Sequence, residues 1–175
     1  MNKTYLLIVA ALIAVVALFR FLPHPPNFVP VMAIALFAGA YITDKRLAFI
    51  IPLAALFISD AIIGFHNTML FVYASVIAMV GIGMLLQNRK RVAPIAIATI
   101  SGSILFFIVT NFGVWAMGTM YPKTVEGLIS CYVAAIPFFR NALAGDLVYV
   151  TMLFGSFALL QRWVPAMRSQ EVPVK

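Results

Sequence analysis

Long apolar runs separated by short polar segments make up most of this chain, and this pattern limits its possible folds more than any other feature. Of its 175 residues, 64% are hydrophobic and only 10% are charged, whereas a soluble domain has about 25% charged residues. So few charges cannot cover a surface that faces water. The sequence therefore predicts an all-α integral membrane protein with a single transmembrane domain over residues 1–175.

Six of the apolar runs are predicted to cross the membrane as helices. They cover about residues 5–21, 29–42, 47–64, 69–86, 92–117 and 142–163. A further apolar stretch, 128–139, has only 12 residues and contains Pro137. A membrane-spanning helix needs about 20 residues, so we expect this stretch to be a short re-entrant or interfacial segment before the last helix. Asn141 would then be the N-cap of that helix.

The basic residues indicate the orientation of the chain and exclude one class of partner. With six spans and the N-terminus inside, nine Lys and Arg residues fall in inner segments and three in outer segments, as the positive-inside rule requires. The nine are Lys3, Lys45, Arg46, Arg89, Lys90, Arg91, Arg162, Arg168 and Lys175. They form short clusters between apolar runs and no basic stripe. We therefore expect the lipid bilayer, and not nucleic acid, as the surrounding partner.

A stiff proline-rich turn separates the first two runs. Residues 23–30 contain four prolines, which cannot continue a helix. The following run from Pro30 to Ile42 has 13 residues and would be about 20 Å long, shorter than the roughly 30 Å apolar core of a bilayer. We expect the turn to dip below the lipid headgroups and the thin, Ala-rich second helix to be buried. Gly81 and Gly83 are predicted close-packing points in the fourth helix.

Polar residues gather at the predicted outer ends of the spans, where they form the candidate substrate-binding site. They are His24, Asn27, Asp60, His66, Asn111, Trp115, Tyr121, Asn141 and Asp146. An acid at the bilayer centre costs roughly 2.5–3.5 kcal/mol, so the two embedded aspartates point to an outward-facing cavity that both of them line. The structural alternative is that Asp60 pairs with Arg20 or Arg140, and that Asp146 caps the last helix.

No catalytic residue, metal site or cofactor is assigned from the sequence. No metal-binding spacing such as His-Glu-x-x-His occurs, and no phosphate-binding loop of the form G-x-x-x-x-G-K-[ST] is found. An integral-membrane enzyme is the second hypothesis, with His24, His66, Asp60 and Asp146 as acid–base groups or metal ligands. A scaffold or assembly factor, in which these residues only hold helices together, is the third.

Several runs resemble a family of small, uncharacterised bacterial membrane proteins. They are FLPHPPNF at 21–28, SD at 59–60, GFH at 64–66, NFGVW at 111–115, GL at 127–128, CY at 131–132, AAIPFF at 134–139 and GDL at 145–147. The resemblance covers about residues 20–155. It implies a multi-pass protein of the bacterial cytoplasmic (inner) membrane, for which both termini are predicted to be cytoplasmic.

The layout is also similar to the substrate-capturing S components of energy-coupling-factor transporters, which have six spans and bind solutes through outer loops. This resemblance implies a binding and translocation subunit for a small nutrient, such as a vitamin, a cofactor precursor or an ion. It also implies a transmembrane coupling subunit with ATPases as partner. Ala10 and Ala14 on the first helix fit the small-residue positions at which S components contact that partner. No vitamin-specific motif of S components is present.

Overall fold

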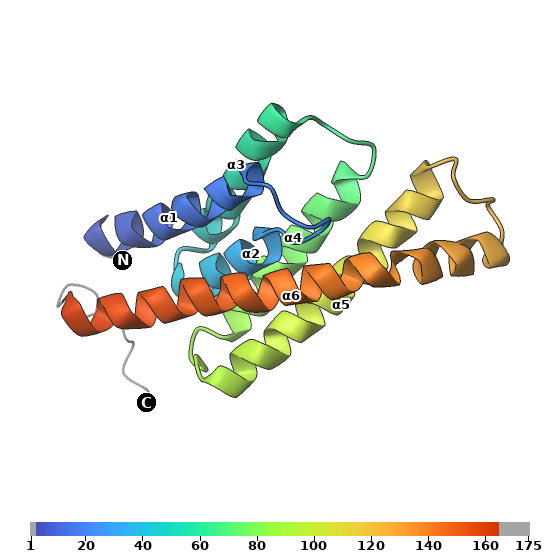
Figure 1. Cartoon of the computed structure of the whole chain (residues 1–175). Helices are drawn as coiled ribbons and strands as arrows, with labels where there is room; N and C mark the ends of the chain where they lie inside the picture. Colours follow the sequence, from blue (N-terminus) through green and yellow to red (C-terminus); the bar gives the residue numbers. More distant parts are fainter. Residues whose placement is uncertain (1–2, 165–175) are drawn as a thin grey trace.

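The computed structural model describes residues 3–164, which contain helices and no strand. Arg168 and Lys175, which were counted among the inner basic residues, lie outside the described residues. The elements are α1 Lys3–Ala17, the short 3-10 helix η1 Leu18–Phe21, α2 Val31–Tyr41, α3 Lys45–Ile63, α4 Met69–Leu85, α5 Val92–Met117 and α6 Val125–Trp163 (Figure 1). The all-helical prediction is therefore confirmed.

Four helical segments are long and apolar enough to cross a membrane, which indicates a membrane protein. They are Lys3–Phe21, Lys45–Ile63, Val92–Met117 and Val125–Trp163. The apolar helices α2 and α4 are shorter, with 11 and 17 residues. The beginning of α1 and the end of α6 lie at the same end of the molecule, and α5 and α6 reach further than the other helices at the opposite end (Figure 1).

Helix α2 forms the centre of the fold, as its thin, Ala-rich sequence predicted. Every residue from Val31 to Tyr41 is buried. Its Gly39 packs directly against Gly83 of α4: a Cβ atom on Gly39 would lie 2.2 Å from the Val80 carbonyl oxygen, and one on Gly83 would lie 2.4 Å from that of Leu36. Gly81 has open space around it. The close-packing prediction is thus confirmed for Gly83 and wrong for Gly81, which points away from α2.

Side chains from other elements complete the hydrogen bonding at the C-terminal end of α2. The last carbonyl groups of a helix have no partner within the helix. Gln87 donates from Nε2 to the Gly39 carbonyl at 3.0 Å, and the Tyr5 hydroxyl donates to the Tyr41 carbonyl at 3.1 Å. A helix end can therefore lie inside the bundle without unsatisfied carbonyl groups.

Helix α6 corrects one prediction from the sequence. Residues 128–139 are not a separate re-entrant or interfacial segment, because a single helix of 39 residues runs from Val125 to Trp163 and contains Pro137. Asn141 lies inside this helix and is not an N-cap; Thr124 is the cap, and its hydroxyl accepts from the Gly127 N–H. At 1.5 Å per residue, α6 is about 58 Å long.

Contacts with α5 explain why the helix continues through this stretch. Tyr132 donates its hydroxyl hydrogen to the Ile108 carbonyl at 2.7 Å, and the rings of Phe107 and Phe139 lie 4.9 Å apart. The 26-residue α5 thus supports the first part of α6 along its length.

Candidate functional site

Asp60 belongs to a buried ionic cluster that joins three elements. It lies in the last turn of α3 and is 1% exposed. Arg20 of η1 places Nη2 2.8 Å from Asp60 Oδ1, and Tyr73 of α4 donates its hydroxyl hydrogen to Asp60 Oδ2 at 3.0 Å. The Arg20 guanidinium also donates to the Ser59 hydroxyl. The pairing with Arg20 that was foreseen as the structural alternative is therefore present.

Tyr73 is not among the site residues predicted from the sequence, although a simple symmetry indicates its position. Helices α3 and α4 form an antiparallel hairpin, so residues at equal distances from the turn face each other. Asp60 and Tyr73 lie at matching distances on either side of the residue pair His66-Asn67. The buried Arg20 Nε atom has no hydrogen-bond partner within residues 3–164.

Asp146 occupies a different and much simpler environment. It is 3% exposed and lies well inside α6, not in its first turn, so it does not cap this helix. Ser103 of α5 places Oγ 2.6 Å from Asp146 Oδ2 and 3.0 Å from the Thr99 carbonyl oxygen. The Ser103 hydroxyl has one hydrogen for two acceptors. The two acceptors therefore share this hydroxyl, which links Asp146 to the backbone of α5.

The loop at residues 22–30 packs directly onto α6 beside Asp146. A Cβ atom on Gly145 would lie 3.2 Å from the Phe28 Cα atom, which means that only glycine allows this approach without displacement. Asn141 of α6 donates from Nδ2 to the Pro26 carbonyl at 3.1 Å. Asn27 follows with φ of 63°, a left-handed conformation that asparagine tolerates better than most residues. The predicted Asn141 and the proline turn are thus brought into contact.

Asn27 and Asn111 line the same small cavity between this loop, α5 and α6. Its volume is about 10 Å³, and its other lining residues are Phe106, Phe107, Thr110, Ala135, Phe138, Phe139 and Ala142. Asn111 donates from Nδ2 to the Phe107 carbonyl at 2.8 Å. Asp60 and Asp146 are not among the residues that line this cavity. Three predicted site residues, Asn27, Asn111 and Asn141, therefore gather around the loop, whereas the two acids lie in separate hydrogen-bonded clusters.

The remaining predicted site residues make local contacts. His24 is exposed and contacts the Pro25 carbonyl at 2.9 Å, and His66 is exposed and contacts the Thr68 hydroxyl at 2.9 Å. Trp115 donates from Nε1 to the Pro122 carbonyl at 2.9 Å and so holds the loop between α5 and α6. Tyr121 is partly buried in that loop. Residues 3–164 contain no group of three His, Cys, Asp or Glu side chains that could hold a metal ion.

Ala10 and Ala14 lie together on an apolar groove between α1 and α3. The groove has a volume of about 380 Å³, and small residues of both helices, including Ala17, Ala54 and Ala55, line it. Ala14 is exposed and Ala10 is partly buried. The small-residue face of α1 is thus open to a neighbouring helix along part of its length.

Comparison with known proteins identifies the family of this chain but assigns no activity to it. No curated protein and no solved structure matches the chain. A family model covers residues 1–167, which is nearly the whole chain and agrees with the resemblance to an uncharacterised family. The chain belongs to DUF6580, a family of unknown function.

Proposed function

We propose that this protein is a membrane-embedded binding and translocation subunit that captures a small polar solute at the end of the bundle formed by the loop at residues 22–30. The observation that supports this proposal is the placement of Asn27 and Asn111 on one cavity beneath a proline-stiffened loop. Irregular backbone at membrane depth is typical of sites that protein or a water-filled cavity surrounds. Interrupted helices that begin at such a site are common in transporters.

The lining of the cavity favours one class of solute. Asn27 and Asn111 supply neutral donors and acceptors, and four phenylalanines supply flat apolar surface. No charged side chain lines the cavity. Such a lining fits a small, uncharged heterocycle, such as a vitamin or cofactor precursor, better than a bare ion, because aromatic faces stack on flat rings and amides pair with their polar edges.

The size of the cavity implies that the loop moves when the solute binds. A volume of about 10 Å³ accommodates roughly one water molecule. In this proposal the structure is the closed form, in which the Asn141 contact with Pro26 and the packing of Phe28 on Gly145 hold the loop down. Lifting the loop would open the space between α5, α6 and the beginning of α2.

The proposed topology has six membrane crossings with both termini on the cytoplasmic side. The short helix α2 completes its crossing together with the loop that precedes it, and α4 crosses as the partner of α3. A subunit of this layout resembles an S component, and the open small-residue face at Ala10 and Ala14 fits contact with a transmembrane coupling subunit. ATPases bound to that subunit would supply the energy.

The test is whether the purified protein carries a small molecule whose retention depends on Asn27 and Asn111. The full chain is purified in mild detergent, and its extract is analysed by mass spectrometry for bound organic solutes. Asn111→Ala removes one neutral hydrogen-bonding group from the cavity, so we expect it to lower the retained solute about tenfold. Asn27→Ala should act in the same direction.

Asn88→Ala is the matched control, because Asn88 is exposed in the loop between α4 and α5 at the opposite end of these helices. It should leave the retained solute unchanged. Recovery of no organic solute, or equal retention by all three variants, would contradict the proposal.

A further inference from the structure

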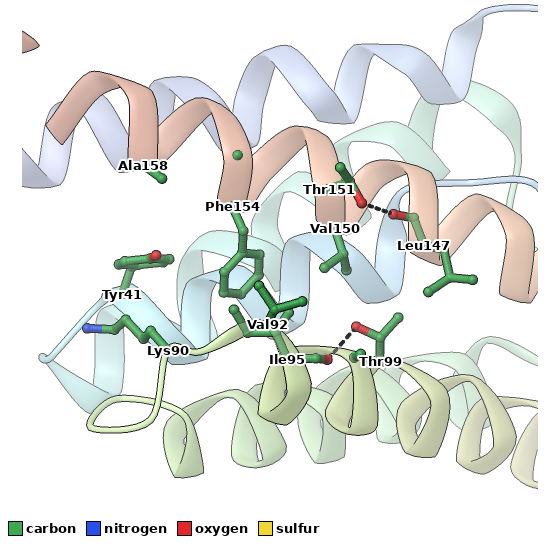
Figure 2. Close-up of a pocket in the computed structure, with 12 residues that line it drawn as sticks. Tyr41, Lys90, Val92, Ile95, Thr99, Leu147, Val150, Thr151, Phe154 and Ala158 are labelled. Atoms are coloured by element: carbon green, nitrogen blue, oxygen red, sulfur yellow. Dashed lines mark hydrogen bonds between the residues drawn. The ribbon is translucent and has the colours of Figure 1, made fainter. Parts of the chain in front are cut away.

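A second groove lies between α5 and α6 near the end of the molecule where α1 begins and α6 ends. Its volume is about 360 Å³. Figure 2 shows Ile95 and Thr99 of α5 facing Leu147, Val150 and Phe154 of α6 across this groove, with Lys90 and Tyr41 at one end. It shares no lining residue with the cavity that Asn27 and Asn111 line.

The groove is apolar although two threonines line it. The Thr99 hydroxyl donates to the Ile95 carbonyl at 2.8 Å, and the Thr151 hydroxyl donates to the Leu147 carbonyl at 2.7 Å (Figure 2). Both hydroxyl groups are therefore satisfied by their own helix backbone. The wall presents mainly hydrocarbon to anything that lies in the groove.

Small residues of α6 keep the groove open. Gly155 and Ala158 line it and are exposed. A Cβ atom on Gly155 would have no heavy atom within 4 Å, so the space beside this residue is empty of protein. A bulky side chain at this position would fill the groove without a clash with the backbone.

The length of the groove matches one leaflet of a bilayer. Its lining residues on α6 extend from Leu147 to Ala158, a rise of about 16 Å at 1.5 Å per residue. Half of the apolar core of a bilayer is about 15 Å thick. The groove thus has the length of a single acyl chain.

Positive charge lies at the end of the groove that faces the loop between α4 and α5. Lys90 lines the groove, and its Nζ atom lies 4.8 Å from the centre of the Tyr41 ring. Arg89 and Arg91 beside it are exposed. Arg91 is the N-cap of α5 and makes no side-chain capping bond. Because Pro94 has no N–H, the donors that the start of α5 presents to an anion here are the N–H groups of Val92 and Ala93.

We propose that this groove binds one anionic phospholipid, with an acyl chain along α5 and α6 and the headgroup phosphate at Lys90. The hydrocarbon wall, the length of one leaflet and the cations at one end together match this occupant. Basic pockets between transmembrane helices are typical sites for anionic headgroups. The bound lipid would fix the spacing of α5 and α6 and is independent of the proposed solute site.

Native mass spectrometry of the delipidated full chain tests this proposal. The protein is mixed with phosphatidylglycerol or phosphatidylcholine that carry identical acyl chains. The wild type should bind phosphatidylglycerol about fivefold more tightly than phosphatidylcholine, and Lys90→Gln should abolish this preference. Gly155→Leu fills the groove and should lower the binding of both lipids.

The matched control is Gly81→Leu, because a Cβ atom on Gly81 also meets no atom within 4 Å but lies on α4, away from the groove. It should bind both lipids as the wild type does. If Gly155→Leu does not fold, Ala158→Leu fills the same groove and should give the same loss. Equal binding of the two lipids by the wild type, or wild-type binding by the folded groove variant, would overturn the proposal.

Discussion

The two buried carboxyl groups differ in what neutralises them. Asp60 has a guanidinium at 2.8 Å and a phenol hydroxyl at 3.0 Å. Asp146 Oδ2 instead contacts the neutral hydroxyl of Ser103 at 2.6 Å. A buried charge without a partner is very costly. Asp60 lies against the Arg20 guanidinium, whereas Asp146 contacts a neutral hydroxyl, so only the loss of Asp60 leaves a buried cation unpaired.

This difference predicts unequal losses of stability for the same substitution at the two positions. Asp60→Asn leaves the Arg20 charge buried without its partner and should lower the free energy of unfolding by about 3 kcal/mol. Asp146→Asn keeps a donor and an acceptor toward Ser103 and should cost less than about 1 kcal/mol. Thermal unfolding of the purified variants in one detergent measures both values.

A double variant separates loss of the pair from a general packing defect. Arg20→Met combined with Asp60→Asn removes the unpaired charge, so it should regain much of the stability that Asp60→Asn loses. A double variant that is less stable than Asp60→Asn would show that the ion pair is not the cause. Similar costs for Asp60→Asn and Asp146→Asn would contradict this difference between the two sites.

At the scale of the elements, the contact between α2 and α4 determines how closely these two helices pack at the centre of the fold. The backbone of Gly39 touches that of Gly83, and atoms of the backbone cannot move aside as a side chain does. Helices with small residues at their crossing approach closely and gain dispersion contacts. Helices α1, α3, α5 and α6 also contact α2, so that it is buried along its whole length.

Gly83→Ala should destabilise the protein by about 1–3 kcal/mol, because its new methyl group meets the Leu36 carbonyl oxygen at 2.4 Å. Gly81→Ala is the matched control on the same helix, with open space around the new methyl group. It should be neutral or slightly stabilising, since alanine favours helices. Melting temperatures of the two variants check the difference, and equal values would refute the close contact.

In the long helix α6, the length of an apolar stretch did not predict where the helix begins. The rule that a 12-residue apolar stretch is too short to cross a bilayer treats the stretch as an isolated element. Here Arg140 and Asn141 stay helical, and α5 packs beside the stretch through Tyr132 and Phe139. Contacts with α5 therefore stabilise the helical conformation at residues where an isolated span would end.

At the scale of the whole molecule, the predicted orientation places the 64–68 turn and the 86–91 loop on opposite sides of the membrane. In a background with Cys131→Ala, Asn67→Cys should react with a membrane-impermeant maleimide in intact cells. Asn88→Cys should react only in inverted vesicles, because the positive-inside rule places Arg89, Lys90 and Arg91 in the cytoplasm. Both positions are exposed, so access to reagent does not limit either reaction. Labelling of both from one side would contradict six crossings.

The sequence by itself determined the class of protein, the position of most helices and the burial of α2. These properties depend on the length and composition of local apolar runs, which are read directly along the chain. Only the tertiary structure decided that Asp60 pairs with Arg20 and Tyr73, that Asp146 meets Ser103, and that Asn27 and Asn111 share a cavity. Such pairings depend on the rotation of each helix about its axis and on its register against its neighbours. An apolar run fixes neither, because lipid accepts every face of an apolar helix equally well.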